Sequence, residues 1–339
     1  MKQVIIKDVA QVELVNVDMP VRQPGEALIK ILYGGICGSD LGTYRGTFLY
    51  SSFPRIPGHE FSAEVIEVDE NEYGIEKGMI VTGNPYYNCG TCYSCQRGYV
   101  NCCESNQTLG AQRDGIFREY FTIPVERLYD GKGLDPKTLA LIEPFCISYH
   151  SVKEAQVKAG DNVLIVGAGT IGILAGIAAK GMGANVCISD LQEMRLEKAH
   201  ELGINTTINP GKDDFNEKVK EITNGNGFDV CIECVGLPST FQNCIDAAAY
   251  KGRVAVVGIG KRTLDFHYST IQTKELSVYG SRNALKQDFI ELIDKVSSKV
   301  YDIDSIISKI YTVDETAEAF ADLAANQDKV LKILVDFTK

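Results

Sequence analysis

Apolar positions in the first part of the chain, up to about residue 145, fall in short runs rich in β-branched residues. Their spacing predicts strands over 27–33 and 62–68. Turn residues interrupt these runs often, at Pro20, Gly25, Pro54, Pro57, Gly74, Gly78 and Gly83. Short strands with frequent turns predict a small β-barrel or sandwich with long loops.

The pattern changes near residue 146, and from Asn162 onward apolar strands alternate with segments of helix length. Strands are predicted over 162–166, 184–190, 228–235, 253–257 and 275–279. Helices are predicted over 170–182 and 191–202, the second with Met194, Leu196, Ala199 and Leu202 as its apolar members. Repeated β-α-β units predict an α/β fold with a doubly wound parallel sheet. After residue 285 we expect a helix over 286–299 and a short α/β tail ending in 330–336.

The composition is that of an ordinary globular chain with an acidic balance. Of its 339 residues 45% are apolar, and 34 basic against 45 acidic residues give a net charge of −11. This length predicts two domains. Negative charge repels phosphate backbones and anionic lipid, so we expect no nucleic-acid partner and no membrane partner. Because no apolar segment has the length of a signal peptide or a membrane span, we expect a soluble, cytoplasmic protein.

A glycine motif, Gly167-Ala-Gly-Thr-Ile-Gly172, directly follows the predicted strand 162–166 and opens a predicted helix. In that context Gly167 permits a tight turn, Gly169 lets the backbone approach a pyrophosphate at the helix N-terminus, and Gly172 lets the helix pack on the strand. Asp190, at the end of the next predicted strand, favours NAD because a carboxylate binds ribose hydroxyls and repels a 2′-phosphate. Arg195 could bind that phosphate, so NADP remains an alternative cofactor. The alternative is a glycine turn in an α/β domain without a nucleotide.

The chain has 11 cysteines, a high number for a cytosolic protein, in which structural disulfides are rare. Four have the spacing Cys89-x2-Cys92-x2-Cys95-x7-Cys103, which suits a tetrahedral zinc site. Four thiolates leave no open position, so this zinc is predicted to be structural. An iron–sulfur cluster and unligated cysteines are the alternatives. Spacing alone does not choose between Cys102 and Cys103 as the fourth ligand.

Other metal-ligand residues are scattered along the first part of the chain: Cys37 in GICGSD, His59 and Glu60 in GHE, and Glu143 in IEP. A thiolate, an imidazole and a carboxylate with one open position make a catalytic zinc site. Each residue also has a structural interpretation: Cys37 as a small buried apolar residue, His59 as a satisfied loop histidine, and Glu143 as a helix cap. The pattern alone does not show that these residues converge.

Together these motifs resemble the zinc-dependent medium-chain dehydrogenases, the group of alcohol, sorbitol and threonine dehydrogenases. The resemblance covers nearly the whole chain and rests on GICGSD at 35–40, GHE at 58–60, the cysteines at 89–103, IEP at 142–144 and GAGTIG at 167–172. It implies a GroES-like β-barrel catalytic domain over 1–145 and 286–339, and a Rossmann NAD-binding domain over 146–285. It also implies two zinc ions per chain, one catalytic and one structural, with Cys103 as the fourth ligand of the structural ion.

The resemblance implies roles for the scattered residues as well. Cys37 and His59 match the family's ligands of the catalytic zinc. Glu60 and Glu143 match a carboxylate ligand and a carboxylate near the zinc-bound water, and which of the two is the direct ligand stays open.

The implied reaction is hydride transfer from a secondary alcohol, activated by zinc as a Lewis acid, to the nicotinamide ring. Ser39 matches the hydroxyl that receives the alcohol proton. Many relatives pass this proton to a histidine three residues further on, where this chain has Gly42. The proton is therefore expected to leave through water or a ribose hydroxyl.

Cofactor and substrate residues are also implied by the resemblance. Those for NAD are Gly167, Gly169, Thr170, Ile171, Gly172, Asp190, Arg195, Val257, Gly258, Ser281 and Arg282. The segments 102–104, 142–145 and 280–283 look most like bacterial sugar-acid dehydrogenases of the L-galactonate and L-gulonate type, and like a starvation-sensing group. A hexonate carboxylate suits an arginine partner. The substrate candidates are Tyr44, Arg45, Arg113 and Arg282, with Arg282 favoured.

The sequence therefore predicts NAD-dependent oxidation of a sugar acid. One alternative keeps the chemistry but acts on a polyol, free or phosphorylated, or on L-threonine. Another is a nucleotide-binding regulatory protein without turnover, against which the intact set of Cys37, Ser39, His59, Glu60 and Glu143 argues. The family also implies a homodimer or homotetramer, but nothing in the sequence fixes the number of subunits.

Overall fold

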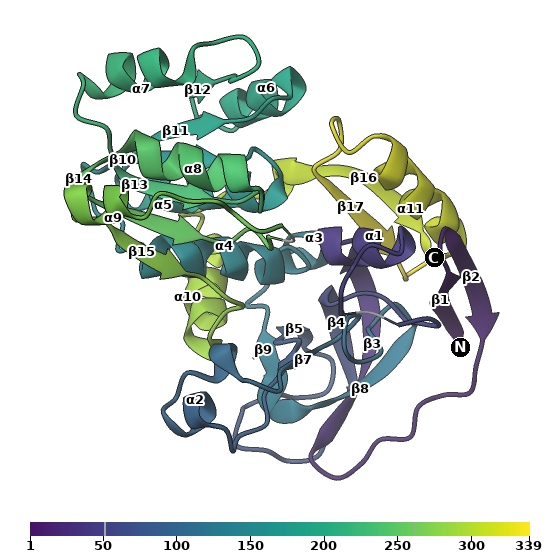
Figure 1. The fold of residues 1–339 in the computed structure, drawn as a ribbon. Coiled ribbons are helices and arrows are strands. Elements are labelled where there is room, and N and C mark those ends of the chain that lie inside the picture. The colour runs from purple at the N-terminus through teal and green to yellow at the C-terminus, as the bar shows by residue number, and fades with distance from the viewer. Residues whose placement is uncertain (51, 261) are drawn as a thin grey trace. The chain divides into compact units, whose positions relative to one another are not determined.

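The computed structural model describes residues 1–50, 52–260 and 262–339 (Figure 1). By its internal contacts the chain forms two compact units. The first comprises residues 1–143 and 285–339, and the second residues 144–284. The boundaries expected from the sequence, 145 and 286, lie two residues and one residue further along the chain.

The first unit is mainly β-structure. Its strands are β1 (Lys2–Asp8), β2 (Gln11–Asn16), β3 (Glu26–Gly35), β4 (Glu60–Glu67), β5 (Ile80–Gly83), β6 (Tyr86–Tyr87), β7 (Gln107–Thr108), β8 (Tyr120–Pro124), β9 (Leu128–Asp130), β16 (Ile307–Thr312) and β17 (Lys332–Asp336). Its helices are α1 (Gly38–Tyr44), α2 (Tyr93–Gln96), α3 (Pro136–Leu139), α10 (Lys286–Ser297) and α11 (Thr316–Ala325).

Within the described residues, the main sheet of this unit has seven strands in the order β16-β17-β3-β4-β5-β9, with β8 also paired to β3. Its central strand β3 buries Ala27, Ile29 and Ile31, while the residues between them are half-buried. That alternation is the signal read from the sequence, because successive side chains of a strand point to opposite faces. The core beneath the sheet includes Phe61, Phe117 and other fully buried side chains.

The second unit alternates strands and helices. Its strands are β10 (Asn162–Val166), β11 (Asn185–Ser189), β12 (Thr206–Ile208), β13 (Phe228–Glu233), β14 (Ala248–Val256) and β15 (Ser277–Gly280). Its helices are α4 (Ile142–Glu154), which begins in the last residues of the first unit, α5 (Thr170–Gly181), α6 (Glu193–Glu201), α7 (Phe215–Thr223), α8 (Pro238–Ala247) and α9 (Ser269–Lys274).

These six described strands form one sheet in the order β12-β11-β10-β13-β14-β15, and every pair is parallel. From β10 the chain proceeds outward to β11 and β12, then returns to β13 on the other side of β10. The strand order therefore reverses between β10 and β13, which is the place where such sheets bind ligands. The predicted doubly wound parallel sheet is confirmed.

Some details of the sequence prediction were wrong, and two of them have a clear physical reason. Met194 is 48% exposed, although Leu196 and Ala199 of the same helix are buried. Residues two apart on a helix point to nearly opposite sides, so Met194 cannot share their face. The strand expected over 275–279 is Ser277–Gly280, because α9 continues to Lys274 and Glu275 ends it in a left-handed conformation.

None of the described helices has both the length and the apolar character needed to cross a membrane.

Candidate active site

Cys37, His59 and Glu60 come together in the first unit, with one ligand atom of each within 4.8 Å of the others. Strand pairing brings them there: β3 and β4 are antiparallel, and Gly35 lies opposite Glu60. A Cβ at Gly35 would lie 2.0 Å from a Glu60 carboxylate oxygen, so this position leaves the Glu60 side chain its space. The convergence that sequence spacing could not show is therefore present in the fold.

Asp40 fixes the backbone on both sides of this cluster. Its carboxylate is buried and accepts hydrogen bonds from the backbone N–H of Cys37 and of Gly58, each at 3.0 Å. His59 Nδ1 lies 4.0 Å from an Asp40 oxygen and has no hydrogen-bond partner in the described part of the chain. Buried polar atoms are normally paired, so this unpartnered nitrogen is unusual. The imidazole of His59, grouped with the Cys37 thiol and the Glu60 carboxylate, fits a zinc ligand set.

Lys332 is a member of this cluster that sequence reasoning missed. Its ammonium group donates to both carboxylate oxygens of Glu60 at 2.7 Å and to the Ile36 carbonyl at 3.2 Å. Both side chains are almost fully buried. Burial by itself lowers the pKa of Lys332, but the charge of Glu60 and then of Cys37 raises that pKa above its usual value. The signal was a single lysine within the apolar run VLKILVD, which an inward-facing charge would explain.

Glu143 lies in the first turn of α4 and is buried, but it is outside the group of Cys37, His59 and Glu60. The hydroxyl of Tyr86 donates a hydrogen bond to its carboxylate. Burial raises the pKa of Glu143 to about 7, opposed by His59 and supported by the negative charge of Glu60. Tyr86 was not singled out in the sequence, which carries no local signal for this contact.

The raised pKa of Glu143 predicts a pH dependence of stability in the metal-free protein. Because folding favours the protonated form, the stabilisation is full below the unfolded-state pKa of 4.5 and is lost as the pH rises through about 7. Urea unfolding of the chelated protein at several pH values is expected to show this loss. Glu143→Gln should remove it, whereas the exposed control Glu126→Gln should keep it. If the free energy of unfolding falls with pH equally in the Glu143→Gln and unsubstituted proteins, Glu143 is not the group responsible.

The second metal-ligand cluster lies in the segment that contains α2. One ligand atom from each of Cys89, Cys92, Cys95 and Cys103 lies within 4.8 Å of the others. Cys103 is buried in this group, whereas the neighbouring Cys102 is exposed. Backbone N–H groups donate to sulfur, from Cys89 to Cys103 at 3.2 Å and from Cys92 to Cys89 at 3.3 Å.

Backbone N–H contacts lower the pKa of Cys89 and Cys92 and so favour their thiolates, the form of cysteine that binds metals, whereas burial raises the pKa of Cys95 to about 11. The N–H groups of Cys95 and Glu104 lower the pKa of Cys92 to about 6. Four sulfur ligands in a closed arrangement fit a structural zinc ion.

In the second unit, the glycine motif connects β10 to α5. Gly167 has a φ of +104°, a value that favours glycine. A Cβ at Gly172 would lie 1.7 Å from the Gly167 carbonyl oxygen, so α5 packs directly on the turn. At Gly169 no described atom lies within 4 Å of a Cβ position, which leaves room for a close ligand. Thr170 and Ile171 form the first turn of α5.

Asp190 follows β11 and is tied to this glycine turn. One carboxylate oxygen accepts from the backbone N–H of Ala168 at 2.8 Å, and the other from Gln192 at 2.9 Å. Arg195 lies 3.4 Å from the same carboxylate. The remaining predicted cofactor residues follow two other strands, Val257 and Gly258 after β14 and Ser281 and Arg282 after β15. All therefore lie at the carboxyl ends of parallel strands, where this type of sheet binds dinucleotides.

The substrate candidates are less well supported by their contacts. Tyr44 packs its ring against Phe320, with centroids 5.5 Å apart. Arg45 donates hydrogen bonds to Gln327 and to a backbone carbonyl at the end of α11. Arg113 stacks on the ring of Tyr87 at 4.0 Å. Arg282 belongs to the second unit and is exposed. For Arg45 and Arg113, these protein contacts already account for the position of the guanidinium group.

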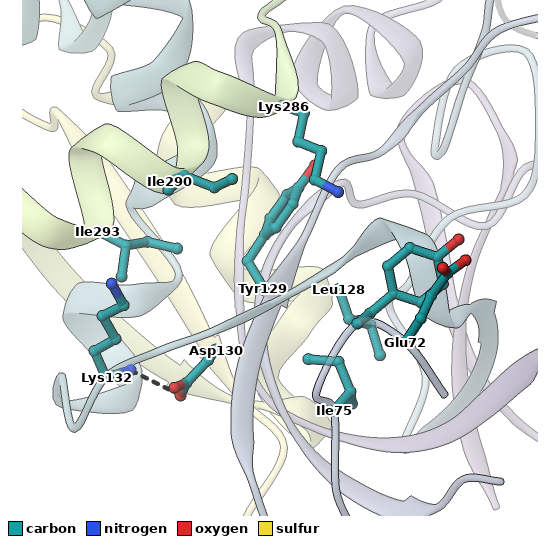
Figure 2. A pocket seen from close by; sticks show the side chains of 10 residues that line it. Glu72, Ile75, Leu128, Tyr129, Asp130, Lys132, Lys286, Ile290 and Ile293 are labelled. Atoms are coloured by element: carbon teal, nitrogen blue, oxygen red, sulfur yellow. Dashed lines mark hydrogen bonds between the residues drawn. The ribbon is translucent and has the colours of Figure 1, made fainter. Parts of the chain in front are cut away.

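A cavity of about 320 Å³ lies in the first unit between α10 and the strand β9 (Figure 2). Its lining mixes apolar side chains such as Ile290 and Ile293 with the ring of Tyr129 and the charged Lys132 and Lys286. None of the lining residues is a predicted metal, cofactor or substrate residue. This cavity is separate from the site built on Cys37 and His59.

Two family models match the chain. The one described as Alcohol dehydrogenase GroES-like domain covers residues 23–132, and the one described as Zinc-binding dehydrogenase covers residues 170–298. A mainly β unit with two metal-ligand clusters, together with a dinucleotide-type parallel sheet, defines the class of zinc-binding dehydrogenases. The chain belongs to the zinc-dependent medium-chain dehydrogenase family.

Individual relatives support this assignment. The chain is 35% identical over 275 residues to an L-galactonate-5-dehydrogenase of Escherichia coli, covering 81% of each chain. It is 38% identical over 275 residues to an L-threonine 3-dehydrogenase of Pyrococcus horikoshii, covering 79% of this chain and 78% of the relative. A solved alcohol dehydrogenase of Escherichia coli CFT073, complexed with NADH, superposes with a TM-score of 0.92 at 29% identity over 99% of both chains. The predicted fold class, oxidoreductase activity, zinc and nicotinamide cofactor are confirmed.

Proposed function

We propose that this protein oxidises a secondary alcohol of a sugar acid, such as L-galactonate or L-gulonate, with NAD⁺ as the hydride acceptor. The observation that carries the substrate class is the relative named L-galactonate-5-dehydrogenase, which matches four fifths of both chains. A solved L-idonate 5-dehydrogenase of Escherichia coli, with a TM-score of 0.90 at 26% identity over 99% of this chain and 98% of its own, supports the same class.

A second candidate substrate is L-threonine, because the relative that is named for it has the higher identity, 38%. A polyol is a third, since a sorbitol dehydrogenase of Halalkalibacterium halodurans is 36% identical over 289 residues. All three substrates carry the secondary alcohol that the chemistry requires, so the metal site does not separate them.

In the proposed reaction Cys37 and His59, with a carboxylate, hold the catalytic zinc. When bound, zinc supplies a Lewis acid for the substrate oxygen and the nicotinamide accepts the hydride. Ser39, two residues after Cys37 on α1, takes the proton of the substrate hydroxyl. Lys332 engages both oxygens of Glu60, and Tyr86 orients Glu143 beside the cluster.

The proton leaves Ser39 by a route that does not use residue 42. The Gly42 carbonyl accepts from the backbone N–H groups of Thr47 and Phe48, at 2.8 and 3.1 Å. A Cβ at Gly42 would lie 3.1 Å from the Cβ of Phe48, so Phe48 occupies the side of α1 where a relay side chain would begin. We infer that water or a ribose hydroxyl of the cofactor carries the proton instead.

We also propose that Asp190 makes NAD the preferred cofactor and that copies of the chain pair through β15. This strand forms one edge of the six-stranded sheet, and Val278 on it is 40% exposed. An unpaired sheet edge is a template for pairing with a second copy.

The test of the substrate is reduction of NAD⁺ by the zinc-loaded protein on a panel of hexonates, hexitols, phosphorylated hexitols and L-threonine, with NADP⁺ in parallel. Turnover on one hexonate supports the sugar-acid assignment. A raised KM for the hexonate with an unchanged KM for NAD⁺ in Arg282→Ala, and neither change in the exposed control Arg97→Ala, places the carboxylate. Turnover confined to polyols or threonine contradicts the substrate class but keeps the dehydrogenase chemistry.

Ser39→Ala is expected to lower turnover by a factor of about 10² to 10⁴, the usual contribution of a positioned proton-transfer group. NADH binding, measured by fluorescence titration, should stay nearly unchanged. Ser39→Thr keeps the hydroxyl and is the matched control, which should retain most of the activity. Full turnover in Ser39→Ala would remove Ser39 from the mechanism.

A further inference from the structure

Glu233, the last residue of β13, places a buried carboxylate in the second unit, and its side chain is not used by the chemistry described above. The residue is 1% exposed. One carboxylate oxygen accepts from the backbone N–H groups of Val235 and Gly236, each at 2.9 Å, and from the hydroxyl of Thr240 at 2.6 Å. The other oxygen accepts from Gly236 at 3.1 Å. The carboxylate therefore holds the loop from β13 to α8 in one shape.

The same residue also holds the loop after β14. The Glu233 carbonyl oxygen accepts from the backbone N–H groups of Val257 and Gly258, at 2.9 and 3.1 Å. A Cβ at Gly258 would lie 2.5 Å from the carboxylate and 2.2 Å from the backbone nitrogen of Gly236. The two loops thus meet at Glu233, and only a residue without a side chain fits at position 258.

Glu233 lies at the point where the strand order of the sheet reverses. In the register of β10 with β13 it is opposite Val166, the residue before the glycine motif. The N–H of Cys234 donates to the Val166 carbonyl at 2.9 Å, and a Cβ at Gly167 would lie 2.6 Å from the Val235 side chain. Glu233 therefore links the glycine turn to the loops after β13 and β14, the three segments that border the dinucleotide site of such a sheet.

A buried carboxylate is costly unless hydrogen bonds replace its water. The donors to Glu233 are backbone N–H groups and a hydroxyl, and the bonds of a charged acceptor are stronger than those between neutral groups. The free energy of these hydrogen bonds serves to fix the loops. Packing alone would not need the carboxylate, because apolar side chains would fill the same space without the cost of burying a charge. A binding site needs such support, because ordering its loops on binding costs free energy and so weakens the binding of the ligand.

We propose that Glu233 is a positioning residue for the nicotinamide cofactor, which acts by holding the loops after β13 and β14 against the glycine turn before the cofactor binds. This inference does not depend on which alcohol the enzyme oxidises. It follows from the same contacts that Thr240, through its hydroxyl, supports the carboxylate.

The test is the dissociation constant of NADH, measured by fluorescence titration of the zinc-loaded protein without any alcohol. Glu233→Gln replaces an acceptor oxygen with an amide group that faces N–H donors, so the constant is expected to rise about tenfold or more. The matched control is Glu221→Gln, which removes one exposed carboxylate, paired with Lys218, from the same unit and should leave the constant unchanged. In turnover assays the KM for NAD⁺ should rise with a smaller change in kcat.

Two further measurements separate positioning from overall stability. Glu233→Asp keeps the charge and should recover part of the affinity, and Thr240→Val should weaken NADH binding by a smaller factor in a protein that still folds. A lower melting temperature with unchanged NADH binding in Glu233→Gln and Thr240→Val would overturn the proposal. If Glu233→Gln does not fold, Thr240→Val decides. Because no alcohol is present, failure of the sugar-acid assignment does not affect the result.

Discussion

Lys332→Met is expected to lower the free energy of unfolding by about 3–5 kcal/mol, the usual cost of removing one partner of a buried ion pair. The substitution leaves the carboxylate of Glu60 fully buried without the ammonium group that now contacts both its oxygens. Denaturant unfolding of the purified protein measures the effect. The exposed Lys329→Met, three residues earlier, is the matched control and should change stability little.

The double variant Lys332→Met/Glu60→Gln separates charge from packing. Removing both charges should recover most of the stability, because a neutral amide costs less to bury than an unpaired carboxylate. Metal analysis should also show a weaker catalytic zinc site in Lys332→Met than in Lys329→Met, since residues that orient a ligand affect metal affinity 10- to 100-fold. Unchanged stability in Lys332→Met would mean that Lys332 does not compensate Glu60.

Cys103→Ser is expected to reduce the zinc content from two ions per chain to one and to destabilise the segment 89–103. The structural cluster uses four sulfur atoms, and a hydroxyl in place of one thiolate binds zinc poorly. Because metal-binding energy in such sites is also folding energy, the loss should appear in thermal unfolding and in faster proteolysis of this segment. Elemental analysis of the dialysed protein measures the zinc directly.

Cys102→Ser is the matched control for this prediction. The residue is adjacent in sequence but exposed, and it lies outside the four-sulfur group. It should keep two zinc ions and an unchanged unfolding profile. Loss of zinc in Cys102→Ser rather than in Cys103→Ser would show that the fourth ligand is the other cysteine.

Some of the fold and the site could be predicted because their signals are local. The glycine turn between the apolar strand and the helix is formed by residues 167–172 alone, so its geometry follows from that short segment. The four cysteines of the structural cluster likewise lie within one short segment. The alternation of strands and helices after Asn162 gave the parallel sheet, although strand order and exact element ends depend on tertiary contacts.

Other parts of the site could not be predicted, since they depend on which strands pair. Cys37 and His59 are separated by α1 and the segment after it, and they meet through the register of β3 with β4. Lys332 reaches Glu60 across 272 positions of the chain because β17 pairs with β3. Glu233 lies inside the strand predicted over 228–235, and only its register opposite Val166 shows that it joins three loops.

The sequence by itself thus determined the chemistry of this protein: which residues can bind zinc, which turn can approach a nucleotide, and the dehydrogenase family that combines them. Tertiary structure alone decided how those residues are held. In the folded chain Glu60 pairs with Lys332, and Tyr86 donates a hydrogen bond to Glu143. The guanidinium groups of Arg45 and Arg113 are held by contacts within the protein. The physical reason is that ligand type and turn geometry are properties of short segments, whereas charge compensation in a buried site depends on strands that are distant in sequence.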